Sequence, residues 1–521
     1  MNQPVTGVTI QSEDEKCSVG TDSDGNYGIS RIATLIVYIG GSSFFWRCDI
    51  IWKKFFQTIV PYILIQNRNS HSMNQLNSTK SLHLILFTLA SFLSSQTFAQ
   101  PGKTEITKWQ DGKKTAVSIT YDDGSRNQFK VALPIMEQLK LPATFFVITG
   151  PIKGSVHPPK FVGRPVDEII AETATVPTNA GNFFERASAC LYLGYAGTLP
   201  YYNKADALYE SGKPEAAWKV IDTLYMKARN KELPPGKDTS MEMAQEQGLT
   251  WTDLKNYAAR GYEPASHTVT HAHLAILDSA NMGYELRKSK DDILKHLGPK
   301  YTFSAEVPFG IEDKRVMKFG FPIYDALRNS MPEPWMEEIN RGYKEQPGNS
   351  TKEYVQWQRG PLSKTTMDLM KSWVDTSLAH DNIWLVLVFH GIDDIGWEPT
   401  PHEKLKQYFE YIKSNENNIW VAPFGDVARY VRERMDAKVK TNKEENKITV
   451  NLTHSLDHQT YDLPLTLKTY VSPQWKNVLV KQNGKQQNIV SQKDTNGSYI
   501  LYKAVPNSGT IAISKSLKRI S

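Results

Sequence analysis

Cysteine is almost absent from the sequence, with only Cys17, Cys48 and Cys190 among 521 residues. Neither a disulfide scaffold nor a cysteine-based zinc site can therefore organise the fold. An excess of one charge sign is also lacking, because the net charge of +6 is spread over the whole length and provides no basic surface for nucleic acid. The hydrophobic and charged fractions, 40% and 22%, exclude a disordered chain and a polytopic membrane protein.

Long apolar runs are lacking too, and one short run is informative. Residues 82–93 follow Met73 and Lys80 and lead to Thr97-Phe98-Ala99, which is the order of a secretory signal peptide. The run is about half of the ~20 residues that a membrane span requires. We expect a signal peptide at residues 73–99, export to the periplasm or the extracellular space, and no stable membrane span in the mature chain.

A signal peptide functions at the start of a chain, yet 72 residues precede Met73. We therefore predict that Met73 is the physiological start and that residues 1–72 are a non-native extension. The alternative is that residues 32–46 and 55–65 are membrane segments. Charges are costly at membrane depth, and four interrupt this region: Arg47, Asp49, Lys53 and Lys54.

Strand and helix patterns alternate over residues 105–438. Thr115–Tyr121 is rich in β-branched and aromatic residues and ends at an Asp-Asp-Gly turn, and after a helical stretch residues 143–148 form a second apolar strand. Residues 383–390 are an unbroken apolar run that ends in histidine, which is typical of a strand buried on both faces. The alternation predicts an α/β fold with a parallel sheet.

Two other regions differ from this pattern. Strand signals disappear at about residues 155–248, where two helices joined by a tight turn predict a helical insertion. Residues 445–521 consist of short alternating strands with hairpin turns at Asn483-Gly484 and Asn496-Gly497. We expect a C-terminal antiparallel β-sandwich that serves as an accessory domain.

Three polar clusters lie at or after the ends of predicted strands. Asp122 and Asp123 follow Thr115–Tyr121 directly. His267 and His271 fall on one face if their segment is helical, so both imidazoles could reach one cation. His390 ends its apolar strand. Each cluster alone is as easily an acidic turn, an incidental pair or a core histidine, but together they are the side chains of a metal-assisted hydrolase.

These motifs resemble those of the polysaccharide deacetylases with the NodB homology domain, carbohydrate esterase family four. Thr120-Tyr121-Asp122-Asp123 matches the first motif, with Tyr121 where Phe is usual, and His267-Thr268-Val269-Thr270-His271 matches the second. His390 matches the essential residue of the last motif. The resemblance covers residues 115–434 and implies a distorted (β/α) barrel with its site at the carboxyl ends of the strands.

The resemblance also implies roles for individual residues. Asp122 would be the general base and His390 the general acid. Asp123, His267 and His271 would bind one divalent metal ion, with zinc the first candidate, and the backbone N–H of Phe309 would hold the oxyanion. The expected partner is an acetylated carbohydrate that loses N- or O-linked acetyl groups; which glycan it is and the oligomeric state stay open.

The third motif departs from the family pattern. Glu306 begins Glu306-Val307-Pro308-Phe309-Gly310, where the family usually has Arg. That Arg keeps the base carboxylate ionised, whereas a nearby Glu would raise the pKa of Asp122 by repulsion. We expect either that another cation substitutes, with Arg328 the first candidate and Arg315 the second, or that activity is weak. The usual aspartate-rich fourth motif is also not clearly present.

Two other functions stay open at this point. One is an amidase on the same scaffold that hydrolyses a non-sugar C–N bond, although the retention of all three candidate metal ligands argues against amidases that work without a metal. The other is a glycan-binding protein that keeps the metal and has lost turnover, an interpretation suggested by Glu306 and the C-terminal domain.

Overall fold

The computed structural model describes most of the chain after residue 99 and five short strands before it. The described residues are 100–516 without 246–247, 311–312, 333–334, 336–337, 342–346 and 348–349, together with the strands within residues 9–47. The chain divides into two compact units, Met1–Gln96 and Thr97–Ser521. The expected signal peptide at residues 73–99 lies outside the described residues, as does most of the predicted extension before it.

The first unit contains two small antiparallel sheets. One has the order β1-β4-β5 and the other pairs β2 with β3. Their bounds are Thr9–Ser12 (β1), Gly20–Thr21 (β2), Tyr27–Gly28 (β3), Thr34–Ile39 (β4) and Ser42–Arg47 (β5).

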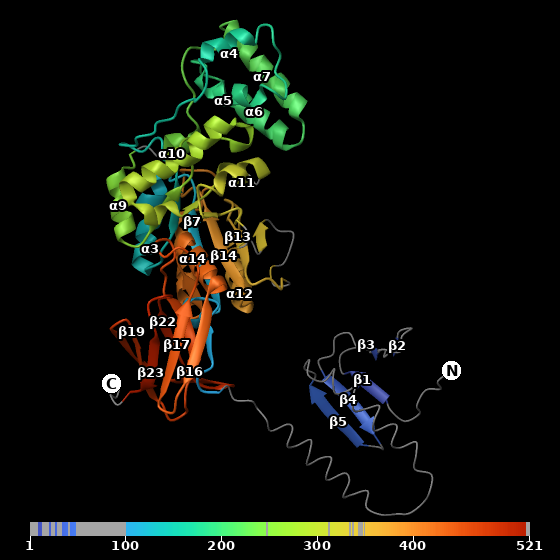
Figure 1. The fold of residues 1–521 in the computed structure, drawn as a ribbon. Helices are drawn as coiled ribbons and strands as arrows, with labels where there is room; N and C mark the ends of the chain where they lie inside the picture. The colour runs from blue at the N-terminus through green and yellow to red at the C-terminus, as the bar shows by residue number, and fades with distance from the viewer. Residues whose placement is uncertain are drawn as a thin grey trace, which may run out of the picture. The chain divides into compact units, whose positions relative to one another are not determined.

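A nine-stranded parallel sheet lies at the centre of the second unit (Figure 1). Its order is β11-β10-β9-β8-β7-β14-β13-β12, and β15 pairs with the start of β7 while β8 pairs with its end. All pairings are parallel. The strands are Thr115–Tyr121 (β7), Thr144–Val147 (β8), Glu263–Ser266 (β9), Ser304–Ala305 (β10), Ala326–Leu327 (β11), Glu338–Arg341 (β12), Val355–Arg359 (β13), Ile383–Phe389 (β14) and Ile419–Val421 (β15). This is the distorted (β/α) barrel expected from the sequence.

The central strands β7 and β14 are buried on both faces, as the unbroken apolar run of β14 predicts. All seven residues of β7 are buried, and their side chains divide between two cores: Val117 and Ile119 lie in one, and Ala116 lies in the other with Trp384 of β14. Helices cover the strands on each side. They are Leu133–Leu139 (α3), Trp251–Ala259 (α9), Ser279–Leu297 (α10), Lys314–Gly320 (α11), Met367–Ala379 (α12), His402–Ser414 (α13) and Phe424–Asp436 (α14).

Between β8 and β9 the described chain forms helices and no strand, as the sequence predicts for the insertion. The helices that precede α9 here are Val166–Glu172 (α4), Phe183–Ala189 (α5), Leu199–Glu210 (α6), Pro214–Arg229 (α7) and Met241–Gln245 (α8). Of these, α4 to α7 share an apolar core of their own. Short turns elsewhere are the π-helical η2 (Gln128–Ala132) and the 3-10 turns η1 (Gln110–Gly112), η3 (Cys190–Tyr192), η4 (Leu274–Ile276), η5 (Pro299–Thr302) and η6 (Pro308–Gly310).

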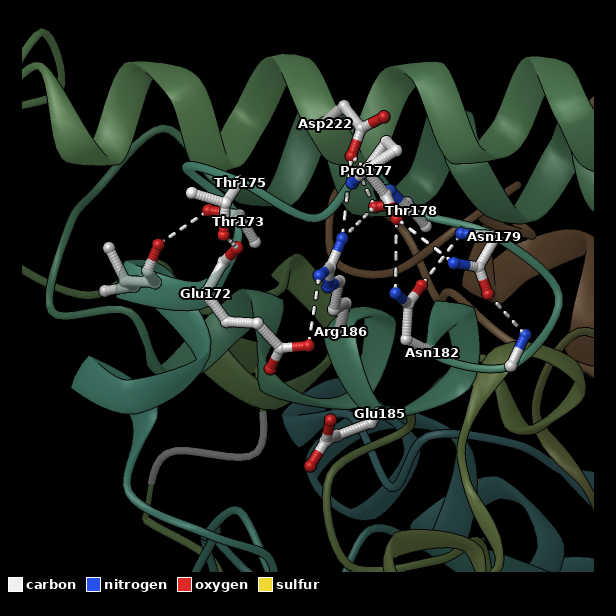
Figure 2. Close-up of polar contacts among 12 residues, drawn as sticks. Glu172, Thr173, Thr175, Pro177, Thr178, Asn179, Asn182, Glu185, Arg186 and Asp222 are labelled. Carbon is white, nitrogen blue, oxygen red and sulfur yellow. Dashed lines mark hydrogen bonds and ion pairs between the residues drawn. The ribbon is translucent and has the colours of Figure 1, made fainter.

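A buried arginine connects three segments of this insertion (Figure 2). The Arg186 side chain is fully buried and donates to Thr178 Oγ1 at 2.9 Å, and Thr178 Oγ1 in turn donates to Asp222 of α7 at 2.5 Å. Arg186 Nη2 also lies 3.5 Å from Glu172 Oε1 at the end of α4. Hydrogen bonds thus connect α5 with α7 through Thr178, and an ion pair connects α5 with α4.

Two antiparallel sheets form the C-terminal part of the second unit. Their orders are β16-β17-β23-β19-β20 and β21-β22-β18-β6. The strands are Thr104–Ile106 (β6), Lys438–Lys443 (β16), Lys447–Thr453 (β17), Leu465–Tyr470 (β18), Asn477–Gln482 (β19), Lys485–Val490 (β20), Gln492–Asp494 (β21), Gly497–Ala504 (β22) and Ile511–Lys515 (β23). β6 comes from before the barrel, which the sequence does not indicate because three residues carry no alternation.

The part of the chain that the structure describes contains no helix with the length and apolar character of a membrane span.

Candidate metal and catalytic site

Three buried side chains converge at the carboxyl ends of β7 and β9, which lie on either side of β8 in the sheet. Asp123 follows β7, and His267 and His271 follow β9. One ligand atom from each lies within 4.8 Å of the other two, and the Nε2 atoms of His267 and His271 are 3.5 and 3.3 Å from Asp123 Oδ1. One carboxylate and two imidazoles fit zinc or a similar divalent ion and leave coordination positions open.

The segment between the two histidines is a tight turn and not the helix considered from the sequence. Thr268 and His271 have φ angles of 68° and 58°, which non-glycine residues rarely adopt. Glu285 of α10 holds this turn, since its carboxylate accepts the N–H groups of Val269 and Thr270 at 2.9 and 2.8 Å and the Thr270 hydroxyl at 2.8 Å. The turn, rather than a shared helix face, directs both imidazoles toward Asp123.

The two histidines are oriented differently. His267 Nδ1 is 2.9 Å from the Glu306 carbonyl oxygen, so it donates there and leaves Nε2 facing Asp123. His271 Nδ1 is buried without a hydrogen-bond partner among the described residues. Burial lowers the pKa of His271, whereas for His267 the neighbouring Asp123 and Asp122 outweigh burial and raise the pKa.

Asp122 forms a bidentate ion pair with Arg328. Arg328 Nη1 and Nη2 are each 2.6 Å from one oxygen of the Asp122 carboxylate, and both side chains are buried. Burial raises the pKa of Asp122, but the Arg328 guanidinium and the His390 imidazole outweigh burial and hold that pKa below its usual value. Asp122 is therefore ionised at neutral pH, and the two contacts with Arg328 fix the orientation of its carboxylate.

Arg328 follows β11, the strand next to β10, and β10 is followed by Glu306, the residue that differs from the family's third motif. β10 and β11 pair with Ala305 opposite Leu327, so Glu306 and Arg328 are the next residues of adjacent strands. Arg328 Nη2 also lies 3.1 Å from Glu306 Oε1. The expectation that Glu306 raises the pKa of Asp122 is therefore wrong. Arg328 contacts both carboxylates, and the pKa of Asp122 is lowered.

The second candidate cation lies elsewhere. Arg315 donates to the carbonyl oxygens of Ala275 and Leu277 at 2.7 Å, and its guanidinium lies over the Phe184 ring. Arg315 therefore contacts the insertion and not Asp122.

His390 follows β14 and completes the cluster around Asp122. Its Nε2 lies 3.5 Å from Asp122 Oδ2, and its ring packs edge-on against Trp397. Gln128 donates to the His390 carbonyl oxygen at 2.8 Å and fixes the backbone there. The side chain is 25% exposed, so a bound molecule can reach it.

A cavity of about 580 Å³ joins these groups. Every candidate site residue lines it: Asp122, Asp123, His267, His271, Phe309, Arg328 and His390. Phe309 lies in a turn with a φ angle of 59°. Glu242 of α8 and Trp397 also line the cavity and were not predicted.

Glu285 is a third residue that sequence reasoning missed. It lies on the buried stripe of α10 with Met282 and Ser289. A carboxylate at a core position of an amphipathic helix was the available signal, because buried acids are nearly always paired or hydrogen-bonded. No comparable signal marks Glu242 or Trp397.

The polysaccharide deacetylase family model matches residues 110–173 and 212–320. The chain carries a polysaccharide deacetylase domain. The matched segments include Asp122, Asp123, His267 and His271, whereas Arg328 and His390 lie outside them. Because the match covers less than half of the chain, it identifies this domain and not the activity of the whole protein.

Other similarities of the chain are more distant. A gellan lyase from a Bacillus species is 30% identical over 279 residues, which are 50% of this chain and 11% of that protein. The chain thus matches about a tenth of the length of this curated relative.

Three solved structures resemble the chain at low identity and low TM-score. Bacillus subtilis PdaA, a family 4 carbohydrate esterase, is 13% identical over 65% of this chain and 88% of that chain, with a TM-score of 0.27. The Xyl-CE4 domain of a xylanase from the Trinervitermes trinervoides hindgut metagenome is 12% identical over 60% and 89%, with a TM-score of 0.27. Puue allantoinase is 10% identical over 62% and 92%, with a TM-score of 0.33.

Proposed function

We propose that the deacetylase domain hydrolyses acetyl groups from an acetylated carbohydrate with the help of a divalent metal ion. The observation that supports this most is that a two-histidine, one-aspartate cluster and a separate Asp122–His390 pair open into one cavity. A metal site alone would support binding, whereas a base and an acid beside it support hydrolysis.

Asp123, His267 and His271 would hold the ion, for which zinc is our first choice. Their donor atoms are buried and close together, and the hydrogen bond from His267 Nδ1 leaves Nε2 as the ligand atom. When bound, such an ion acts as a Lewis acid on the acetyl carbonyl and lowers the pKa of its water.

Asp122 and His390 would move the protons. The Asp122 carboxylate, kept ionised by Arg328, accepts a proton from the attacking water. His390, which lines the cavity and is 25% exposed, would donate a proton to the departing amine or alcohol. The backbone N–H of Phe309 would donate to the oxygen of the acetyl carbonyl as it gains charge.

The walls of the cavity suit a sugar. Three of its lining side chains are large, apolar and exposed: Phe309 at 52%, Leu362 at 44% and Trp397 at 48%. Apolar and aromatic faces pack against the C–H faces of pyranose rings, whereas the acetyl group needs only to reach the cluster. We further propose that the protein is exported, on the basis of the signal-peptide pattern at residues 73–99.

Acetate release tests this function. The zinc-loaded protein is incubated with a panel of N- and O-acetylated oligosaccharides and with acyclic amides, and acetate and ammonia are measured. We expect acetate from at least one glycan, and a loss of 10²- to 10⁴-fold in Asp122→Asn, which keeps the shape but not the base. The exposed Asp368→Asn on α12 serves as the matched control.

Each alternative function predicts a different result. Ammonia or another amine from an acyclic amide would favour the amidase. Glycan binding without any acetate would favour a binding protein and would contradict the proposal.

A further inference from the structure

The orientation of His271 depends on packing. Metal-ligating histidines almost always donate their second ring N–H to a partner that fixes the ring. His267 has such a partner in the Glu306 carbonyl, but His271 Nδ1 has none among the described residues. The Phe309 ring instead packs edge-on against His271, with a centroid distance of 4.6 Å.

Phe309 is in turn held by His273. The two rings are stacked with centroids 3.8 Å apart and an angle of 7° between their planes. This contact supports an aromatic side chain that is 52% exposed and whose backbone has a φ angle of 59°. Without the His273 ring, Phe309 would lose its main flat contact and with it the fixed position against His271.

Three residues of helix α6 in the insertion contact His273. Asp206 Oδ2 is 2.8 Å from His273 Nδ1, and Asn203 Oδ1 is 3.2 Å from Nε2. The His273 backbone N–H donates to the Tyr202 hydroxyl at 3.1 Å. Polar atoms of one helix thus lie within 3.2 Å of both ring nitrogens and of the backbone N–H of His273, with Nδ1 facing Asp206 at ion-pair distance and without hydrogen-bond geometry.

The insertion also contacts the residues that follow His273. Ile276 is buried in the apolar core of the insertion, and Ser188 of α5 accepts the backbone N–H of Asp278 at 2.9 Å. The internal network around Arg186 makes the insertion a firm support, because it joins α4, α5 and α7 (Figure 2). A chain of contacts therefore connects the helical insertion, through His273 and Phe309, with the candidate metal ligand His271.

We propose that helix α6 of the insertion positions the metal ligand His271 through His273 and Phe309. Asp206 and His273 are then positioning residues of the metal site, and the insertion is a part of that site rather than an appended subdomain. This inference rests on the metal binding that the proposed function includes, but not on the substrate or the reaction.

Zinc affinity in substituted proteins tests this role. The dissociation constant is measured on the full chain by competition with a chelating dye for the wild type, Asp206→Ala, His273→Ala and His273→Phe. Lys204→Ala, exposed on the same helix, is the control. Folding of each variant is checked by circular dichroism and by unfolding in excess chelator.

We expect His273→Ala and Asp206→Ala to weaken zinc binding by about 10- to 100-fold, the range found when partners of metal ligands are removed. His273→Phe keeps a flat ring on Phe309 but loses the contacts with Asp206 and Asn203, so its loss of affinity should be smaller than that of His273→Ala. Lys204→Ala should not change the affinity. If His273→Ala does not fold, Asn203→Ala, which removes one contact to the ring, should weaken binding in the same direction.

Unchanged zinc affinity in folded His273→Ala would overturn the inference, as would equal losses in His273→Ala and His273→Phe. The result is separable from the proposed function. A wild type that binds zinc but releases no acetate would refute the deacetylase proposal alone, and a wild type that releases acetate while His273→Ala binds zinc normally would refute only this inference.

Discussion

Arg328 and Asp122 share two hydrogen bonds of 2.6 Å in a setting where both side chains are 4% exposed. The arginine of the usual third motif is missing from the sequence, and its place is taken by Glu306. A guanidinium on the adjacent strand thus restores the charge balance around the candidate base. Its two-pronged contact also fixes the rotation of the carboxylate, which a point charge would not do.

Arg328→Lys should therefore keep most of the fold and lose much of the rate. Lysine retains the charge but cannot contact both oxygens, so the pKa of Asp122 should rise and the acid-side fall in acetate release should move to higher pH. The pH–rate profile measures this, with exposed Arg126→Lys as the control. A profile that keeps its acid limb in Arg328→Lys would contradict the role assigned to Arg328.

Removal of the charge should instead affect stability. Arg328→Gln leaves the Asp122 and Glu306 carboxylates buried without their shared cation. Breaking a buried ion pair in this way costs about 3–5 kcal/mol of unfolding free energy. Chemical denaturation measures that loss, and a change below about 1 kcal/mol would show that the pair is not buried in solution.

Glu285 should prove essential for the turn that carries the histidines. Its carboxylate accepts three hydrogen bonds from Val269 and Thr270. Glu285→Ala leaves those buried donors unsatisfied, at about 1–3 kcal/mol each, and should lower both the unfolding free energy and zinc affinity. Glu285→Gln keeps one acceptor oxygen and should lose less. Identical behaviour of the two variants, measured by denaturation and zinc titration, would be inconsistent with this account.

Glu433 of α14 gives a pH dependence with a defined sign. The side chain is fully buried, Oε1 accepts the Leu463 N–H at 3.1 Å, and burial raises its pKa from 4.5 to about 8. Between pH 4.5 and about pH 8, Glu433 is ionised in the unfolded chain but still protonated in the folded chain. This group therefore lowers the free energy of unfolding as the pH rises. The effect is about 1 kcal/mol per pH unit.

Glu433→Gln should therefore flatten the pH dependence of the unfolding free energy between pH 5 and pH 8. The amide keeps an acceptor for Leu463 and does not titrate. Glu410→Gln, an exposed substitution on α13, is the control. Parallel stability curves for the wild type and Glu433→Gln would contradict a raised pKa for this group.

Zinc should stabilise the folded protein, because the three ligands converge only in that state. At a free concentration of 100 times the dissociation constant, the gain is about 2.7 kcal/mol, and a chelator removes it. His271→Ala should abolish most of the gain, whereas His402→Ala, a half-exposed histidine outside the cluster, should not. Scanning calorimetry with and without zinc makes the comparison; an equal response in both variants would place the bound ion elsewhere.

Much of the site could be predicted because parallel strands bring their carboxyl ends to one edge. Asp122, Asp123 and His390 follow two central buried strands, β7 and β14, which pair side by side. Their order along an alternating chain, with the His-x3-His pair between them, is enough to suggest a common cavity. Burial of β14 on two faces is likewise visible in its unbroken apolar sequence.

The remaining features depend on tertiary register and on weak local signals. The contact of Arg328 with Asp122 depends on the pairing of two-residue strands, β10 and β11, which no periodicity marks. The turn at His267–His271 requires left-handed backbone at Thr268, a conformation that a β-branched residue does not suggest. The contacts of α6 with His273 join residues 70 positions apart, and only the packed insertion reveals them.

The most direct measurement is an anomalous difference map, recorded at the zinc absorption edge, from crystals of the full chain grown with zinc. We expect one strong peak bonded to Asp123 and to the Nε2 atoms of His267 and His271 at about 2.0–2.2 Å. Zinc bound at other residues, with no density between these three side chains, would contradict it.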